Sequence, residues 1–102
     1  MISVIVTYQV KPEFSEQNKN NIQRFLADFE ALDSSQFNYT ILCKEDGISC
    51  VHISRYASKE IQDQLLNIPS FKEFQRLRDE SGLADSHRVE VHNLIGSKGN
   101  LK

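Results

Sequence analysis

The chain has 102 residues and a formal net charge of -2, with 39% hydrophobic and 25% charged residues. This balance is typical of a globular domain and argues against a disordered chain or a membrane span. Acidic and basic residues are interspersed, so the sequence lacks the positive patch needed to bind a phosphate backbone, and neither a nucleic-acid nor a membrane partner is expected. We expect one domain over residues 1–96 and a polar tail over residues 97–102.

The first ten residues predict a strand because apolar and polar side chains alternate. Its strongly apolar face carries Ile2, Val4, Val6, Tyr8 and Val10. The segment has no basic region or cleavage site of a signal peptide, which predicts a cytoplasmic location. Pro12 ends the strand and suits the first turn of a helix.

An amphipathic helix is expected from about Glu13 to Leu32, and it should cover one face of a sheet. Its apolar stripe consists of Ile22, Phe25, Leu26, Phe29 and Leu32. The side chains expected to face away from the sheet are Gln17, Asn20, Asn21 and Asp28.

Two further strands, "FNYTILCK" and "ISCVHISRY", form a predicted hairpin around "EDG". A two-residue Asp46-Gly47 turn would pair Cys43 with Cys50 at a hydrogen-bonded position, where a disulfide is disfavoured. A three-residue loop with a bulge would instead move the two cysteines out of register. Either alternative predicts free thiols, and neither cysteine has the spacing of a zinc site.

A second helix is predicted to start at Ser58 and to break at Pro69. Ser70 and Glu73 then form the pattern of a capping box, and Gly82 is a helix stop. The last strand is "RVEVHNLIG". The order of elements predicts a ferredoxin-like α+β fold, βαββαβ, in which a four-stranded antiparallel sheet carries its helices on one face. The uncovered face should form a homodimer with the same face of a second copy.

The sequence resembles the antibiotic biosynthesis monooxygenase-like family of dimeric α+β barrels. The resemblance rests on "VKPEF", "EDG", "HISRYASKE" and "NIPSFKEFQ", and it spans most of the chain. It implies a dimer and a pocket between sheet and helices in each subunit. It also implies membership in a family that includes cofactor-independent oxygenases of aromatic and quinol molecules as well as haem-degrading enzymes.

Haem degradation is not expected, because the chain has no tryptophan and Leu65 and Gln75 stand near the family's tryptophan and histidine positions. Ser70 also replaces the histidine that many relatives carry at the helix break. Any proton transfer must therefore come from elsewhere in the chain.

His52 is the candidate catalytic base, because a neutral imidazole near tyrosine hydroxyls can deprotonate a phenol before it reacts with oxygen. Tyr39 and Tyr56 are candidate donors that would orient the substrate. The alternative for these residues is a structural role in the core or at an interface, which is the commoner role of buried histidines and tyrosines.

The candidate pocket-lining residues are apolar or lie near the helix break, and core packing is their alternative role. They are Phe25, Phe29, Leu65, Phe71, Phe74 and Gln75. His87 and His92 point to opposite faces of a strand, so no metal site is expected, and no cofactor is implied. The predicted function is oxidation of a small aromatic or quinol-type ligand by a monooxygenase-like oxidoreductase. The alternative is a binding or regulatory dimer without catalysis.

Overall fold

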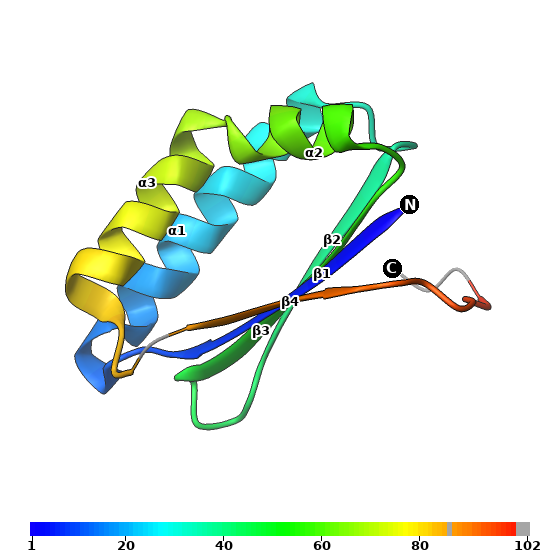
Figure 1. Cartoon of the computed structure of the whole chain (residues 1–102). Coiled ribbons are helices and arrows are strands. Elements are labelled where there is room, and N and C mark those ends of the chain that lie inside the picture. The colour runs from blue at the N-terminus through cyan, green and yellow to red at the C-terminus, as the bar shows by residue number, and fades with distance from the viewer. Residues whose placement is uncertain (86, 100–102) are drawn as a thin grey trace.

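The computed structural model describes residues 1–85 and 87–99; residue 86 and the end of the predicted tail, 100–102, lie outside the described residues. Three α-helices lie on one side of a four-stranded sheet (Figure 1). In chain order the elements are β1 (Ile2–Gln9), α1 (Ser15–Asp28), β2 (Phe37–Cys43), β3 (Ser49–Tyr56), α2 (Lys59–Leu66), α3 (Pro69–Leu77) and β4 (Arg88–His92).

The strand order is β2-β3-β1-β4, and every neighbouring pair is antiparallel. This is the ferredoxin-like arrangement that the sequence predicts. Val6 pairs with His52 in β3, and His52 pairs with Ile41 in β2, so these three side chains share one face of the sheet. The helices cover this face, so the strongly apolar side of β1 is the one that faces the core.

The first helix is shorter than predicted, because 3₁₀ turns at Pro12–Phe14 and Phe29–Ala31 flank α1. Two side chains depart from the predicted helix faces. Asn21 is buried with 6% of its surface exposed, whereas Leu26 is 37% exposed. The inner face of α1 is therefore rotated toward Asn18 and Asn21, because α3 as well as the sheet packs against this helix.

The β2–β3 hairpin adopts the first of the two registers considered, with Cys43 opposite Cys50, but the prediction of free thiols is wrong. Lys44 and Ser49 close a four-residue loop, in which the Asp46 carboxylate accepts bonds from the backbone amides of Ile48 and Ser49. This longer loop moves the cysteines to a non-hydrogen-bonded position, where their Cα atoms are 4.1 Å apart and a disulfide joins them.

The second helical region breaks at Pro69 as predicted, into α2 and α3. Ser58 caps α2 by accepting a bond from the amide of Ile61. The predicted capping box at Ser70 is wrong, because Pro69 occupies the first turn and Ile68 is the N-terminal cap residue. Ser70 donates instead to the Asp28 carboxylate, which ties α3 to the end of α1. After α3, a π-helical turn runs from Arg78 to Gly82.

The last strand ends at His92, earlier than the predicted Gly96, and all five of its residues are exposed. β4 pairs only with β1, so it is an edge strand. Val89 and Val91 are 54% and 73% exposed, because the helices cover the other three strands.

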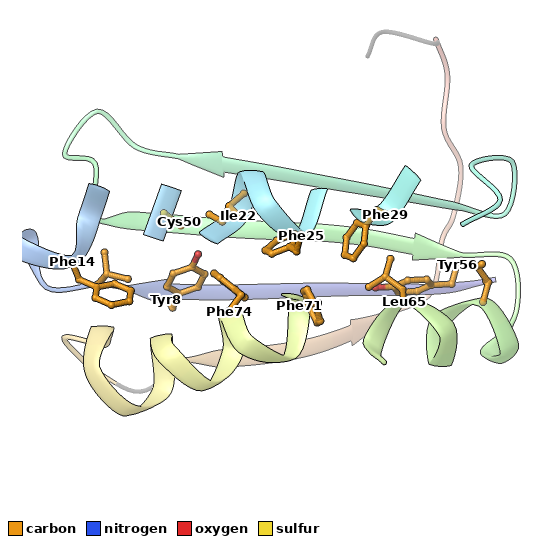
Figure 2. Close-up of a cluster of buried hydrophobic side chains, with 12 residues drawn as sticks. Tyr8, Phe14, Ile22, Phe25, Phe29, Cys50, Tyr56, Leu65, Phe71 and Phe74 are labelled. Atoms are coloured by element: carbon orange, nitrogen blue, oxygen red, sulfur yellow. The ribbon is translucent and has the colours of Figure 1, made fainter. Parts of the chain in front are cut away.

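The core lies between the helices and the inner face of the sheet and is rich in aromatic rings (Figure 2). Its buried apolar residues are Tyr8, Val10, Phe14, Ile22, Phe25, Phe29, Cys50, Tyr56, Ile61, Leu65, Phe71 and Phe74. Among the described residues, no helix is both long and apolar enough to cross a bilayer.

Candidate functional site

His52 lies at the centre of β3 and faces the helices, with only 2% of its surface exposed. Both of its ring nitrogens contact tyrosine hydroxyls. Nε2 lies 2.8 Å from the hydroxyl oxygen of Tyr8 on β1, and Nδ1 lies 2.8 Å from that of Tyr39 on β2. Three neighbouring strands therefore contribute one side chain each to a buried polar group, because all three face the same side of the sheet.

The hydrogen bonds of this group form one chain from Asn18 to Tyr39. The Asn18 side-chain amide on α1 donates to the Tyr8 hydroxyl oxygen at 3.1 Å. A neutral imidazole carries one hydrogen, so one of its nitrogens donates to a tyrosine oxygen and the other accepts from a tyrosine hydroxyl. Tyr39 forms the other end of the chain and is only partly buried.

Burial keeps this group uncharged. Loss of solvation lowers the pKa of His52 to about 3, with a further contribution from the nearby positive charge of Arg78. Burial raises the pKa values of Tyr8 and Tyr39 above their ordinary value. At neutral pH the group therefore consists of a neutral imidazole between two neutral phenols.

Aromatic rings enclose His52. The Phe74 ring stacks on the imidazole with 5.4 Å between ring centroids and an angle of 25° between planes, and Phe25 lies 6.2 Å away. Of the predicted pocket-lining residues, five are buried in the core and Gln75 is half-buried. The five buried ones are Phe25, Phe29, Leu65, Phe71 and Phe74.

Tyr56 lies away from His52, although it shares the same face of β3. Its partners across the sheet are Ile2 and Phe37, at the end of the strand near α2. Figure 2 shows Tyr56 beside Leu65, whereas Tyr8 and Phe74 lie further along the core. Of the two predicted tyrosines, the structure brings only Tyr39 into contact with the imidazole.

A surface hollow of about 490 Å³ lies over the opposite face of the sheet. Its lining includes Thr7, Leu42, Lys44, Val51 and Arg88, and it contains none of the predicted site residues. Tyr8 is the one member of the polar group around His52 that belongs to this lining, so the hollow is not the predicted pocket between sheet and helices.

Three residues of the site were not predicted from the sequence. They are Tyr8, Asn18 and Arg78. The Arg78 guanidinium is buried and lies 5.2 Å from the centre of the Tyr8 ring and 5.3 Å from that of Phe74. Two features of the sequence could have indicated them. Tyr8 alternates with polar residues on the apolar side of β1, and Asn18 lies four residues before Ile22, on the apolar stripe of α1.

The described residues contain no group of three or more His, Cys, Asp or Glu side chains placed to hold a metal ion. No protein-family model matches the sequence, and no curated protein matches it. Solved structures do match across nearly the whole chain. A structure described as an antibiotic biosynthesis monooxygenase has a TM-score of 0.77 and 14% identity, covering 94% of this chain and 100% of that one.

Two further solved structures match this chain to a similar extent. Rv0793 from Mycobacterium tuberculosis has a TM-score of 0.78 and 18% identity, covering 96% of this chain and 98% of that one. A proposed antibiotic biosynthesis monooxygenase from Nitrosomonas europaea has a TM-score of 0.78 and 13% identity, covering 94% and 100%.

The chain has the antibiotic biosynthesis monooxygenase-like fold. The resemblance stated from the sequence is thereby confirmed at the level of structure. At these identities the likeness extends to the fold alone, so the chemistry of this chain must be argued from its own residues.

Proposed function

We propose that the protein is a cofactor-independent monooxygenase-like oxidoreductase that acts on a small phenol- or quinol-type molecule held between its sheet and its helices. One observation carries the proposal, namely the hydrogen-bonded chain Tyr8–His52–Tyr39 inside an aromatic layer. An apolar interior with a few convergent polar groups is typical of small-molecule sites. The fold shared with proteins described as antibiotic biosynthesis monooxygenases supports the same reaction class.

The chain's own residues would supply binding, orientation and proton transfer. Tyr39 lies at the partly buried end of the hydrogen-bonded chain, so a ligand hydroxyl that displaces it meets Nδ1 of His52. In the tautomer that carries its hydrogen on Nε2, His52 donates to the Tyr8 oxygen and would take the ligand's proton at Nδ1. The resulting phenolate transfers an electron to oxygen more readily than the neutral phenol does.

A ligand of this kind requires a change in packing. The ring centroid of Phe25 is 5.0 Å from those of Phe71 and Phe74, so side chains occupy the space beside His52. Both phenylalanines of the second helical region lie on α3, which the break at Pro69 separates from α2. We therefore expect α3 to shift away from the sheet when a ligand binds.

A specific observation favours a second candidate function, a non-catalytic binding or regulatory protein. Burial lowers the pKa of His52 to about 3, and both ring nitrogens already have partners. In this closed state the imidazole is a weak base. Catalysis therefore depends on the ligand-bound state restoring its basicity, whereas simple binding does not.

The outer face of the sheet supports the proposed homodimer. Ile5, Val51 and Ile53 on this face are partly buried, and Leu42 is 55% exposed. Ile5 pairs directly with Ile53 across β1 and β3, so the apolar side chains are contiguous. A cytoplasmic location belongs to the same proposal, but the Cys43–Cys50 disulfide counts against it because cytosolic thiol pools keep most cysteines reduced.

The test is oxygen uptake by metal-free protein with a panel of hydroquinones and polycyclic phenols. His52→Ala and Tyr39→Phe are compared with wild type, and His92→Ala, an exposed histidine on β4, is the matched control. Uptake that is lost in His52→Ala and kept in His92→Ala supports the oxygenase. Binding of the panel without uptake above that of His52→Ala supports the non-catalytic protein instead.

A further inference from the structure

The surface hollow on the outer face of the sheet has no part in the proposed function. Its volume of about 490 Å³ lies in the range of small-molecule sites. Thr7 in β1 pairs with Arg88 in β4 on one side and with Val51 in β3 on the other, and Val51 pairs in turn with Leu42 in β2. These lining residues therefore form one row across all four strands, with a cation at one end and apolar side chains at the other.

The charges of the hollow favour an anion. Lys44 and Arg88 both line it, and Asp85 is the acidic residue among its described lining residues. No ion pair joins Lys44 or Arg88 to another described residue, and Asp85 already has an interaction within the protein. Hydrogen bonds, chiefly from Ser49, lower the pKa of the Asp46 carboxylate, and the nearby charge of Lys44 contributes. Lys44 thus has an acidic neighbour, which leaves Arg88 as the main anion-binding group.

The amide and hydroxyl side chains of the hollow are engaged with each other. Gln9 donates to the Ser49 hydroxyl at 3.0 Å, and that hydroxyl donates to Asp46 at 2.7 Å. The hydrogen-bonding capacity that remains is mostly that of donors, on the guanidinium of Arg88 and the ammonium of Lys44. Such a set fits a ligand group that only accepts hydrogen bonds, as a carboxylate does.

The other end of the row is apolar. Leu42 is 55% exposed and Val51 is partly exposed, although both are aliphatic. Neighbouring strands are about 4.8 Å apart, so the row from Arg88 to Val51 is about 10 Å long. A chain of roughly six carbon atoms covers most of this length. An inorganic anion would leave the apolar surface in contact with water.

We infer that the hollow binds an organic carboxylate whose apolar body is a short carbon chain. The carboxylate accepts two hydrogen bonds from the planar guanidinium of Arg88, and the chain lies over Val51 and Leu42. The hollow lies on the opposite face of the sheet from His52. The inference therefore adds a second site and does not depend on the proposed oxygenase site.

The carboxylate site lies beside the centre of the proposed dimer interface. Ile5 and Ile53 pair in the middle of the outer face, and the pair of Thr7 with Val51 lies two residues further toward the β2–β3 loop. A bound carboxylate therefore leaves the centre of the apolar face to the second copy.

The experiment titrates the protein with sodium hexanoate and with hexanamide, its uncharged analogue, and follows backbone amides by NMR. We expect hexanoate to bind about tenfold more tightly than hexanamide and to shift the amide signals of Thr7, Val51 and Arg88. Arg88→Gln should weaken hexanoate binding about tenfold and change hexanamide binding by less than about twofold. Arg55→Gln is the matched control, because Arg55 lies on the same face toward the other end of β3 and does not line the hollow.

A second variant tests the apolar end of the hollow. Leu42→Asn should weaken hexanoate binding about threefold and leave acetate binding unchanged, because acetate has no chain to lie over this side chain. Equal binding of hexanoate and hexanamide overturns the inference, as does hexanoate binding that survives in Arg88→Gln. Inorganic phosphate that binds more tightly than hexanoate overturns it too, since the hollow would then select charge alone.

The second copy of the chain is the competing occupant of the hollow. If Arg88→Gln converts a dimer to a monomer and leaves hexanoate binding unchanged, Arg88 pairs with the second copy and the inference is wrong. The titration involves no oxygen uptake and no phenol. Its failure therefore leaves the proposed function untouched, and loss of oxygen uptake in His52→Ala has no bearing on hexanoate binding.

Discussion

The hydroxyl of Tyr8 and Nε2 of His52 are 2.8 Å apart, although the two residues are separated by 44 positions in the sequence. The contact crosses from β1 to β3 and fixes the imidazole from one side, while Tyr39 holds it from the other. This arrangement holds a titratable side chain neutral inside an aromatic core. The stability of the fold should therefore depend measurably on pH.

The free energy of unfolding should fall as the pH drops from 7 toward 5 because of His52. Burial lowers its folded-state pKa to about 3 from the ordinary 6.5, so the unfolded chain binds the proton more readily in this interval. The contribution of neutral His52 to the free energy of unfolding is therefore fully present above pH 6.5. Below that pH it decreases by at most about 1.4 kcal/mol per pH unit. Urea unfolding at pH 7, 6 and 5 measures this slope.

The free energy of unfolding of His52→Gln should depend less on pH in the same experiment, since glutamine does not titrate. The carboxylates of Asp33, Asp46 and Glu73 have lowered pKa values and lose their stabilising contribution only at more acidic pH. They therefore do not obscure the comparison above pH 5. An identical slope in wild type and His52→Gln would contradict the neutral buried imidazole.

Reduction of the Cys43–Cys50 disulfide should destabilise the protein by about 2 kcal/mol, because the bond restrains a short loop of the unfolded chain. Thermal melts with and without dithiothreitol measure the change. A double variant, Cys43→Ser with Cys50→Ala, should show the same melting temperature in both conditions. Alkylation of two thiols in the unreduced protein would show that the bond is absent.

Gly82→Ala should destabilise the fold by about 1–3 kcal/mol through overpacking. A Cβ atom at this position would lie 2.5 Å from ring atoms of Phe14, in the 3₁₀ turn before α1. Gly96→Ala is the matched control, because nothing lies within 4 Å of the added atom. Equal denaturation midpoints for the two variants would refute the close contact.

Two serines distinguish the observed helix starts from the predicted ones. Ser58→Ala should cost about 0.5–2 kcal/mol, since the hydroxyl caps α2. Ser70→Ala should cost less, because the residue follows Pro69 inside α3 and its hydroxyl donates to an exposed carboxylate of Asp28. Urea unfolding of both variants gives the comparison. A larger loss of stability in Ser70→Ala than in Ser58→Ala would support the predicted capping box.

Ile53→Lys should convert the proposed dimer to a monomer, because it places a charge at the centre of the apolar outer face. Leu66→Lys is the control, since this leucine lies on α2 and is already 37% exposed. Analytical ultracentrifugation gives the mass of each variant. Wild-type protein that sediments as a monomer at all concentrations would exclude the dimer.

Local patterns predict most of the fold, because they depend on residues close in the sequence. The alternation in β1, the break at Pro69 and the cap at Ser58 all have short-range causes. The errors arose where neighbouring residues were compatible with more than one local structure. Asp46 accepts bonds from two backbone amides, which favours a four-residue loop over a two-residue turn and changes the position of both cysteines.

The candidate site could be predicted only in part, since its contacts join distant segments. His52 and Tyr39 belong to one hairpin, so their proximity follows from its register. Tyr8 reaches the imidazole only after β1 pairs with β3, and Arg78 reaches the Tyr8 ring only after the turn that follows α3 docks. Nothing in the local sequence of Asn18 shows that a polar residue on an apolar stripe will face a tyrosine hydroxyl.

The strand order places β1, the first of these four strands along the chain, at the interior of the sheet between β3 and β4. Its pairing with β4 joins Thr7 to Arg88, near the two ends of the chain. The β2–β3 hairpin, by contrast, closes over only a few residues. Distant pairings slow folding because a long loop must close first. During synthesis the hairpin can therefore form early, while β1 keeps an unpaired edge until the ribosome releases β4.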